Sequence, residues 1–352
     1  MTHRRILAAM LVLALAATSC DRTPHLIPAN ADSTQASPDT LAILARTAAD
    51  HWDAGDDEQA SALSARVVLE ALRLRPTAPW PERAGRLLDS LGFAAEVAGD
   101  EKLLVVNLFS RARGGDSSYP FLFWRAAGPH MQPLEASDLH LVAVAGRGFK
   151  RSNEVSDTSQ AAVIWARRAG GGQQPRLMVW RMAGGGRWDL GQMLGPDSLG
   201  GIGSAEFVGT DANLALTTRT YRSTQYFDEC PGCPHVYHEG RFQWRSDGFE
   251  RVEDEIVPSA YAAFTGFISA LVADDRERAS RYAVDPSLVE FAHRHEWQFP
   301  SRGRWRVAPG SVEGLSSMVF LRGTNDAFRV AFESRDGDWV IAGFEPTVRP
   351  ME

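Results

Sequence analysis

The segment from Cys230 to His238 combines residue types that bind metals or form disulfides. It reads Cys-Pro-Gly-Cys-Pro-His-Val-Tyr-His, so a Pro-Gly pair separates Cys230 from Cys233. Proline followed by glycine at two central positions is typical of a type II turn, whose end residues lie within ~7 Å of each other. A disulfide can span that distance. We therefore predict a structural disulfide between Cys230 and Cys233, in a ring so small that it contributes only about 2 kcal/mol.

Three other chemistries fit parts of the same segment. Zinc could be bound by Cys230, Cys233, His235 and His238, although the spacing is tighter than in a zinc finger and a strand would point the two histidines to opposite faces. A thiol oxidoreductase motif belongs at the start of a helix, whereas strands are predicted on both sides here. Covalent haem needs a histidine directly after the second cysteine, where Pro234 stands. The disulfide is our main interpretation, zinc is the alternative, and no cofactor is expected.

Tyr261 and His295 are candidates for a ligand pocket nearer the C-terminus. Tyr261 falls on the inward face of a helix predicted from Pro258, where its hydroxyl either donates into a pocket or packs in the core. His295 falls on an otherwise apolar helical face, where a histidine is either a proton-transfer group or a core residue. Both residues are therefore retained as pocket candidates.

The first twenty residues predict the compartment in which this chemistry takes place. Arg4 and Arg5 precede an apolar run that ends at Ala17, and Thr18-Ser19-Cys20 follows. The run is shorter than the roughly 20 apolar residues of a membrane span, so residues 1–20 are predicted to be a secretory signal.

The end of this signal resembles the lipobox of bacterial lipoproteins. The matching residues are Ala17-Thr18-Ser19-Cys20. The resemblance implies that Cys20 is acylated, with palmitate or a similar chain, and becomes the mature N-terminus. The alternative is ordinary signal cleavage near Ala16 or Ser19, which leaves Cys20 as a free thiol. The lipobox interpretation places the protein at the cell envelope, lipid-anchored on the periplasmic or extracytoplasmic face, where oxidation of Cys230 and Cys233 is favoured.

The charge balance limits the possible partners. Removal of residues 1–19 takes away Arg4 and Arg5 and no acidic residue, so the net charge falls from −7 to −9. An acidic chain without a long basic run is not expected to bind nucleic acid. It also gains no attraction to an anionic membrane, so the membrane is expected to be a partner only through lipid on Cys20. Residues 21–37 are short, polar and proline-containing, which predicts a flexible tether.

The next two regions differ in hydrophobic period. Residues 38–92 have helical spacing, with Ser37-Pro38-Asp39 as the first helix start and further helices after Asp57 and from Pro81. This predicts an N-terminal helical cap. Residues 93–254 have a period of two, which predicts an antiparallel β-rich domain, either a sandwich or a twisted sheet. Strands are predicted at 103–109, 121–124, 139–144, 161–165, 177–180, 205–208, 214–220 and 235–244.

A weak internal repeat supports hairpins in the β-rich domain. Trp-Arg followed by a glycine-containing stretch occurs at Trp124, Trp180 and Trp244. We expect a buried tryptophan at the end of a strand, an outward arginine, and a turn that requires glycine. Three irregularly spaced units are too few for a closed propeller, which is why a sandwich or twisted sheet is preferred.

Residues 257–348 are predicted to form an α+β domain. Helices are expected from Pro258, around 276–283 and from Pro286, and strands near 304–307, 315–321, 328–333 and 339–344. This order, with the closing strand Asp338–Phe344, resembles the nuclear transport factor 2-like superfamily of cone-shaped α+β domains. The resemblance implies a conical domain of a kind found in small-molecule isomerases and hydrolases and in many non-catalytic modules. No catalytic motif of that superfamily can be placed here, so no catalytic residue is predicted.

The predicted fold class is therefore α+β multidomain. We expect an exported envelope protein that acts as a non-enzymatic binding or assembly module for an envelope protein or a small ligand. The alternative is a small-molecule hydrolase or isomerase that uses the C-terminal pocket, and thiol or metal chemistry at 230–238 is a third class. A deep pocket with convergent polar groups would favour an enzyme, whereas a filled cone would favour binding.

Overall fold

The computed structural model describes residues 37–74, 79–110, 117–126, 128–149, 159–169, 172–184, 186–210, 213–246, 248–309, 316–324 and 326–348. Residues 36–352 belong to one compact unit. The predicted signal, Cys20 and the tether up to residue 36 lie outside the described residues. Within the described ranges, no helix combines the length and apolarity that a membrane crossing requires.

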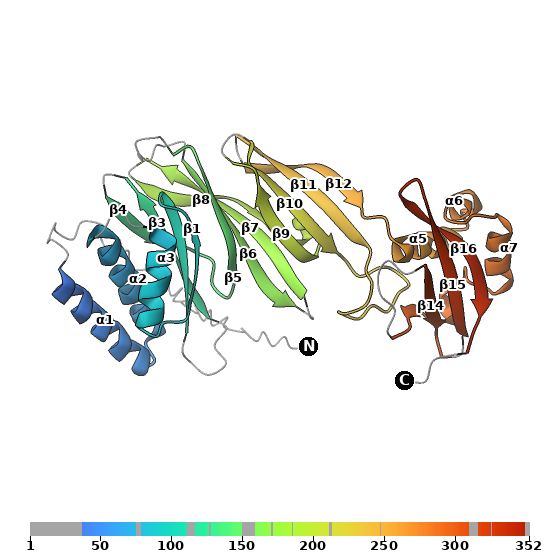
Figure 1. Ribbon diagram of the computed structural model, residues 1–352, viewed down its shortest axis with the longest axis horizontal. Coiled ribbons are helices and arrows are strands. Elements are labelled where there is room, and N and C mark those ends of the chain that lie inside the picture. The colour runs from blue at the N-terminus through green and yellow to red at the C-terminus, as the bar shows by residue number, and fades with distance from the viewer. Residues whose placement is uncertain are drawn as a thin grey trace, which may run out of the picture. The chain divides into compact units, whose positions relative to one another are not determined.

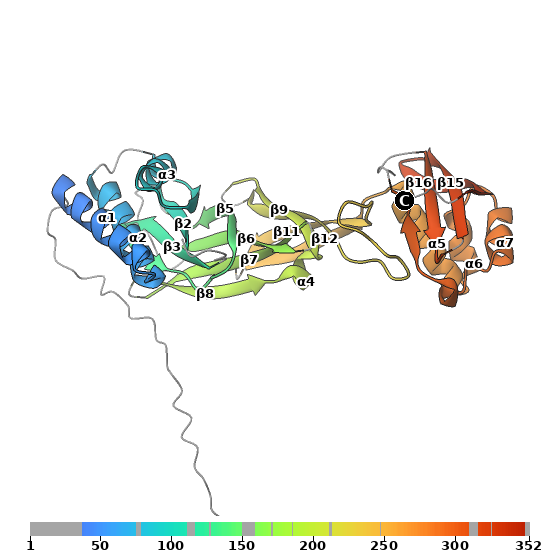
Figure 2. The same ribbon diagram turned by 90° about the horizontal axis from the view of Figure 1, so that it is seen from below.

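The helical cap forms as predicted. Its helices are α1 (Pro38–Asp53), α2 (Asp57–Leu74) and α3 (Trp80–Ser90). Ser37 is the N-cap of α1, and its side chain accepts a hydrogen bond from Thr40 N at 3.1 Å, which confirms the predicted start. α2 and α3 cover one face of the first sheet and α1 packs on α2 (Figures 1 and 2), and Leu72, Trp80 and Leu88 pack there with Phe123. The apolar stripe of the helices is therefore buried against strands.

The β-rich region contains three four-stranded antiparallel sheets, each with its strands adjacent in chain order. The first sheet consists of β1 (Ala95–Gly99), β2 (Leu103–Phe109), β3 (Ser118–Arg125) and β4 (Pro129–Pro133). The second consists of β5 (His140–Arg147), β6 (Gln160–Ala169), β7 (Gly172–Ala183) and β8 (Arg187–Leu194). The third consists of β9 (Ile202–Val208), β10 (Ala215–Tyr221), β11 (Tyr237–Arg245) and β12 (Gly248–Ile256), with the short helix α4 (Pro196–Leu199) before it.

Three sheets form, rather than a two-sheet sandwich or one twisted sheet, because the second sheet is apolar on both faces. On β6, Val163 and Trp165 pack toward the first sheet, and Ile164 packs toward the third. A strand that is buried on both sides needs a layer on each side. The third sheet ends the series because its outer face carries cross-strand ion pairs such as Arg219–Glu239, with 2.9 Å between Nη1 and Oε1.

The repeated Trp-Arg pairs mark the third strand of each sheet. Trp124, Trp180 and Trp244 lie on β3, β7 and β11 and are all buried. The expectation that each following turn requires glycine holds for two of the three turns. Gly248 has φ +136° and a Cβ there would lie 2.3 Å from Gln192 Oε1, and Gly186 in the turn after Trp180 has φ +81°. The expectation is wrong for Gly128, where φ is not positive and a Cβ would meet nothing within 4 Å.

A second repeat connects the fourth strands of successive sheets. Gln132 on β4 donates to Trp188 O at 2.7 Å and accepts from Trp188 N at 2.9 Å. Gln192 on β8 makes the same pair of bonds with Phe249 on β12, at 2.9 and 2.8 Å. Each glutamine therefore continues the backbone hydrogen bonding of the next sheet.

A half-exposed polar cluster also joins the first two sheets. The Glu96 carboxylate lies 2.8 Å from His140 Nδ1 and accepts from Leu141 N at 2.6 Å. Asn107 Nδ2 donates to the same carboxylate at 3.2 Å. The cluster connects β1 to β5, the first strand of each sheet.

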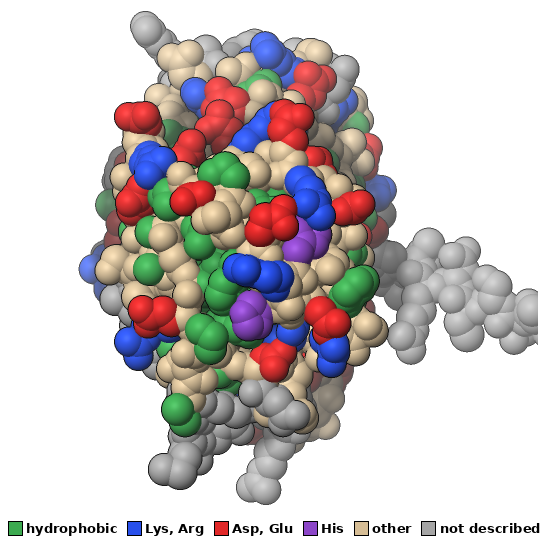
Figure 3. Space-filling view, turned by 90° about the vertical axis from the view of Figure 1, so that its right-hand side faces the viewer, with side chains coloured by type: hydrophobic (Ala, Val, Ile, Leu, Met, Phe, Trp, Pro, Cys, Tyr) green, Lys and Arg blue, Asp and Glu red, His purple; other side chains and the backbone are tan. Residues whose placement is uncertain are grey.

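The α+β region follows with the predicted order of elements. Its helices are α5 (Ala260–Val272), α6 (Arg276–Arg281) and α7 (Ser287–Arg294), and a 3-10 turn covers Pro300–Arg302. The fourth sheet is a meander of β13 (Trp305–Val307), β14 (Ser317–Arg322), β15 (Asp326–Arg335) and β16 (Asp338–Pro346). The segment between α6 and α7 adds to the sheet edge, since Val284 N donates to Ile341 O and Ile341 N donates to Tyr282 O. On the face shown in Figure 3, acidic and basic side chains alternate.

Candidate binding cleft beside the disulfide loop

The connection between β10 and β11 leaves the third sheet and enters the core of the α+β region. Phe227 is 1% exposed and packs edge-on against Tyr261 and Phe264. The backbone around it pairs with β13, because Asp228 N donates to Trp305 O at 2.7 Å and Trp305 N donates to Tyr226 O at 2.8 Å. We call this connection, residues 222–236, the clasp.

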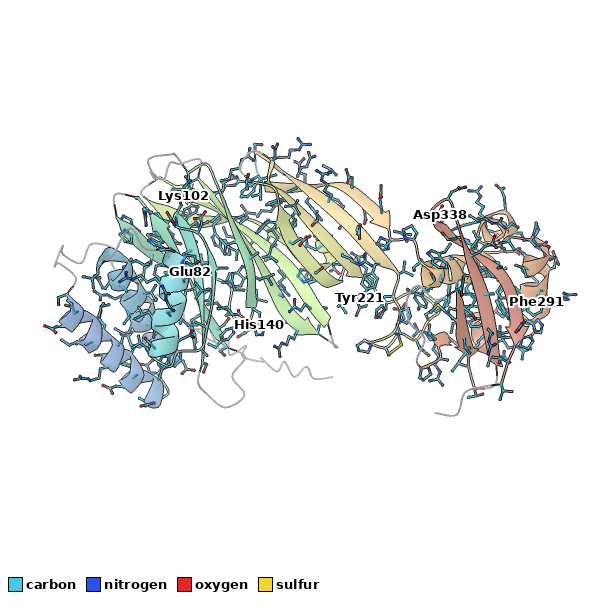
Figure 4. The ribbon with its side chains drawn as sticks, viewed as in Figure 1. Glu82, Lys102, His140, Tyr221, Phe291 and Asp338 are labelled. Atoms are coloured by element: carbon cyan, nitrogen blue, oxygen red, sulfur yellow. A yellow bond between two sulfur atoms is a disulfide. The ribbon has the colours of Figure 1, made fainter. Side chains whose placement is uncertain are left out.

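The predicted disulfide lies at the tip of the clasp. Cys230 and Cys233 are bonded, their Cα atoms are 5.1 Å apart, and Cys233 N donates to Cys230 O at 2.9 Å. The Pro-Gly turn therefore brings the two cysteines within bonding distance, as the sequence predicts. The sulfur–sulfur bond is the yellow bond near the end of the third sheet, where Tyr221 is labelled (Figure 4).

The four residues of the zinc alternative are not brought together as a ligand set. The two sulfur atoms bond to each other, and thiolates are the form of cysteine that binds zinc. His235 is 3% exposed and stacks on Tyr221 with 3.6 Å between ring centroids. His238 lies on β11, with its Nδ1 3.5 Å from Asp254 Oδ1. Among the described residues, no group of three or more potential ligands is arranged to hold a metal ion.

Glu229 organises a buried polar network directly before the disulfide. Its side chain is 4% exposed, and Oε1 accepts a hydrogen bond from the Tyr261 hydroxyl at 2.8 Å. Oε2 accepts from Thr224 N at 3.1 Å and lies 3.5 Å from His235 Nδ1. The network therefore joins three positions of the clasp to α5.

The environment of this network favours a charged glutamate and a neutral tyrosine. Burial by itself raises the pKa of Glu229, but the interactions with His235, Thr224 and Tyr261 outweigh burial and lower that pKa below its ordinary value. For Tyr261, burial and the adjacent Glu229 carboxylate both raise the pKa far above its ordinary value. Tyr261 therefore donates a hydrogen bond and Glu229 accepts it throughout the physiological pH range.

Tyr261 and His295, the two predicted pocket residues, lie in different surroundings. Tyr261 is 2% exposed and its hydroxyl is directed to Glu229. His295 is half-buried at the C-terminal end of α7, with its ring centroid 4.4 Å from Phe291 and 5.5 Å from Phe328. Tyr261 therefore binds the clasp through Glu229, and His295 packs at the edge of the aromatic core.

The space between the helices and the fourth sheet is filled by aromatic side chains. Phe264 stacks on Phe320 with 3.8 Å between centroids, and Trp297 packs against Trp305 at 4.9 Å. All four side chains are at most 2% exposed. A filled interior is the outcome that favours a binding module over an enzyme with a deep pocket.

A cleft of about 980 Å³ lies instead between the third sheet and the α+β region. One wall comes from the ends of β10 to β12, and the other from α5, the end of α6 and the turn between β15 and β16. Ala262, Gly266 and Ser269 are half-buried and line the α5 side, with Tyr282 and Trp339 beside them. A Cβ at Gly266 would lie 2.5 Å from the Tyr282 ring, so glycine is needed for this close packing.

Charged side chains dominate the rim of the cleft. Its aspartates are Asp254, Asp336 and Asp338. Its arginines are Arg222, Arg251, Arg278, Arg281 and Arg335. Arg251 pairs with Asp254 at 2.6 Å, and Arg281 and Arg335 pair with Glu277 and Glu333 just outside the lining. Within the described residues, Arg222 and Arg278 have no carboxylate partner.

Neither Glu229 nor the cleft was predicted from the sequence. A signal for the clasp was present, because Tyr226 and Phe227 stand together in the middle of a long connection between strands. Such a pair is typical of a segment that inserts into a core. The cleft arginines carry no comparable signal, since they come from four separate elements or connections of the chain.

We compared the chain with protein-family models, with curated proteins and with solved structures, and none of them matches it. The likeness to the nuclear transport factor 2-like superfamily therefore remains a prediction from the sequence.

Proposed function

We propose that the protein is an exported, lipid-anchored module of the cell envelope that binds a ligand in the cleft without catalysing a reaction. The observation that carries this proposal is the filled interior of the α+β region, where the side chains of Phe264, Phe320, Trp297 and Trp305 occupy the space between the helices and the fourth sheet. The cleft is a concave surface outside that core and is open to a ligand.

The domain layout is part of the same proposal. We assign residues 38–92 to a cap, 93–254 to a β-rich domain and 257–348 to a conical domain related to the nuclear transport factor 2-like superfamily. The order of three helices followed by a four-stranded meander supports the last assignment. Residues 1–20 are assigned to a signal and 21–37 to a tether, with Cys20 as the lipidated residue.

The anchor can be tested by detergent partitioning. The wild-type protein should enter the detergent phase, and Cys20→Ser should abolish this, because acyl chains supply the membrane affinity. The control is Ser204→Cys, because its added cysteine lies outside the lipobox and does not receive lipid in this scheme. A Cys20→Ser protein that stays membrane-bound to the same extent would contradict the anchor.

Ligand binding in the cleft can be tested by photocrosslinking in intact cells. A photoreactive residue is placed at Ser223, which is exposed and lines the cleft, or at Ser204 on the outer face of the third sheet. We expect an adduct from Ser223 that is absent from Ser204. Equal labelling at both positions, or none at Ser223, would contradict binding in the cleft.

A hydrolase or isomerase is the second candidate function. It is favoured by one pair in the cleft wall, His238 and Asp254, whose side chains lie 3.5 Å apart and could act in proton transfer. Turnover of activated esters or phosphate esters that His238→Ala abolishes would favour this alternative. We expect no turnover.

A further inference from the structure

The cleft is more basic than the chain that forms it. The chain has a net charge of −7, yet its cleft is lined by five arginines and three aspartates, a formal excess of two positive charges. Arg251 is paired with Asp254, and Arg281 and Arg335 are paired with Glu277 and Glu333 just outside the lining, so Arg222 and Arg278 are the lining arginines without a carboxylate partner among the described residues. A cleft lined mainly by one sign of charge concentrates ligands of the opposite sign.

The arginines are available to a ligand. Within the described residues, Arg222 and Arg278 lack a carboxylate partner, and the Arg222 guanidinium donates only to the backbone oxygen of Asp197. Arg281 pairs with Glu277, but these side chains are 73% and 83% exposed. Exposed pairs contribute little, about 0–1 kcal/mol, so a ligand can replace them.

The arginines also come from both walls of the cleft. Arg222 and Arg251 belong to the third-sheet wall, while Arg278, Arg281 and Arg335 belong to the α+β wall. A guanidinium fork binds phosphate oxygens in a bidentate manner. A ligand that contacts both walls therefore needs more than one oxyanion group. The first turn of α5, at Ser259 and Ala262, adds the positive end of a helix to the same space.

The size of the cleft indicates a small molecule. Its volume of about 980 Å³ lies at the upper end of the roughly 300–1,000 Å³ range of small-molecule sites. The small side chains of Ala262, Gly266 and Ser269 leave room on the α5 side, and Tyr282 and Trp339 provide flat apolar surfaces. We infer that the cleft binds a small polyanion of the phosphate-ester or polyphosphate class, an inference that rests on the proposed function of the cleft.

The test uses inorganic tripolyphosphate as the probe and the full chain in detergent. Titration calorimetry at low salt should show binding of tripolyphosphate that is tighter than binding of inorganic phosphate and weakens with added salt. Arg222→Gln and Arg278→Gln should each weaken it roughly ten- to a hundredfold, because each removes hydrogen bonds to a charged group. Both side chains are exposed, so folding should be retained, as thermal unfolding would show.

Arg329→Gln is the matched control. Arg329 is an exposed arginine of β15 outside the cleft, and its replacement should leave the affinity unchanged. Equal weakening in Arg329→Gln, or no tripolyphosphate binding at about millimolar concentration in the wild type, would overturn the inference. If the Ser223 crosslink persists in that case, the proposed function stands and only the ligand class is wrong.

Discussion

Two glutamate–histidine pairs occupy very different environments in this protein. Glu229 and His235, with 3.5 Å between Oε2 and Nδ1, are 4% and 3% exposed in the clasp. Glu96 and His140, with 2.8 Å between Oε1 and Nδ1, are 31% and 38% exposed between the first two sheets. The shorter pair retains contact with water, so its loss can be compensated by hydration. The longer pair cannot be hydrated in the same way, and we expect it to matter more for stability.

The largest effect is expected from Glu229→Ala. This change leaves the Tyr261 hydroxyl and Thr224 N without their buried acceptor and removes the carboxylate that lies 3.5 Å from His235 Nδ1. The free energy of unfolding should fall by about 3–5 kcal/mol in urea denaturation. Glu239→Ala, which removes an exposed ion pair with Arg219, is the control and should cost less than about 1 kcal/mol. A similar fall in the free energy of unfolding for both variants would show that burial does not make Glu229 more important for stability than Glu239.

Tyr261→Phe should have the second largest effect. It removes one hydrogen bond to the Glu229 carboxylate and keeps the ring in the aromatic core. A hydrogen bond to a charged group contributes about 1.5–3 kcal/mol, and urea denaturation should report a loss of that size. Tyr226→Phe in the same clasp is the control. A Tyr261→Phe protein as stable as the wild type would mean that the hydroxyl contributes nothing to holding the clasp.

The double change Cys230→Ser, Cys233→Ser should lower the free energy of unfolding by about 2 kcal/mol, since the ring is small. Reduction of the wild-type protein should reproduce this loss, and reduction of the double variant should change nothing. Mass analysis of the oxidised protein should show two fewer hydrogens and no stoichiometric zinc. One zinc ion per chain, lost together with folding in His235→Ala, would contradict the disulfide.

Glu96→Gln should cost less than about 1 kcal/mol. Glu96 and His140 are partly exposed, whereas Asn107 is buried, and the amide oxygen can still accept a hydrogen bond from Leu141 N. Urea denaturation of Glu96→Gln and of Glu229→Gln under the same conditions compares the free energy lost at the two pairs directly. A larger loss for Glu96→Gln than for Glu229→Gln would reverse the ranking proposed here.

The smallest effect is expected in the pH dependence of stability. The pKa of Glu229 is lowered on folding, so its stabilising contribution is fully present above the unfolded pKa near 4.5 and is lost as pH falls through the folded pKa. Urea denaturation between about pH 6 and 3 should give a steeper loss for wild type than for Glu229→Gln. Parallel curves for the two proteins would mean that the pKa of Glu229 does not change on folding.

The helix order and all central strands could be predicted from the sequence, but only half of the edge strands: β5, β9, β13 and β16 were predicted and the other four were not. The strand 103–109 was predicted with the bounds that the structure gives it, because all of its residues except Asn107 are apolar. The four strands that the prediction lacked are β1, β4, β8 and β12, and each lies at an edge of its sheet. Edge strands carry prolines and charges that weaken the alternating pattern, as in the acidic β12.

The candidate site was predictable only where its determinants are local. The disulfide depends on four consecutive residues, and the prediction for Cys230 and Cys233 is confirmed. The role of Tyr261 was predicted only as a choice between pocket and core, because its partner Glu229 is 32 residues away in the sequence. The cleft depends on which elements meet after folding, and neither periodicity nor spacing contains that information.

The clasp also limits how the two sides of the cleft can turn against each other. The covalent crossing is the segment between Ile256 and Ala260, and a single crossing of this kind acts as a swivel. Phe227 adds a second point of attachment, since the chain passes from the third sheet to Trp305 and back again before β11 begins. Two separate attachments resist torsion about the covalent crossing as long as Phe227 stays in place. We therefore expect the cleft to widen or narrow more easily than it twists.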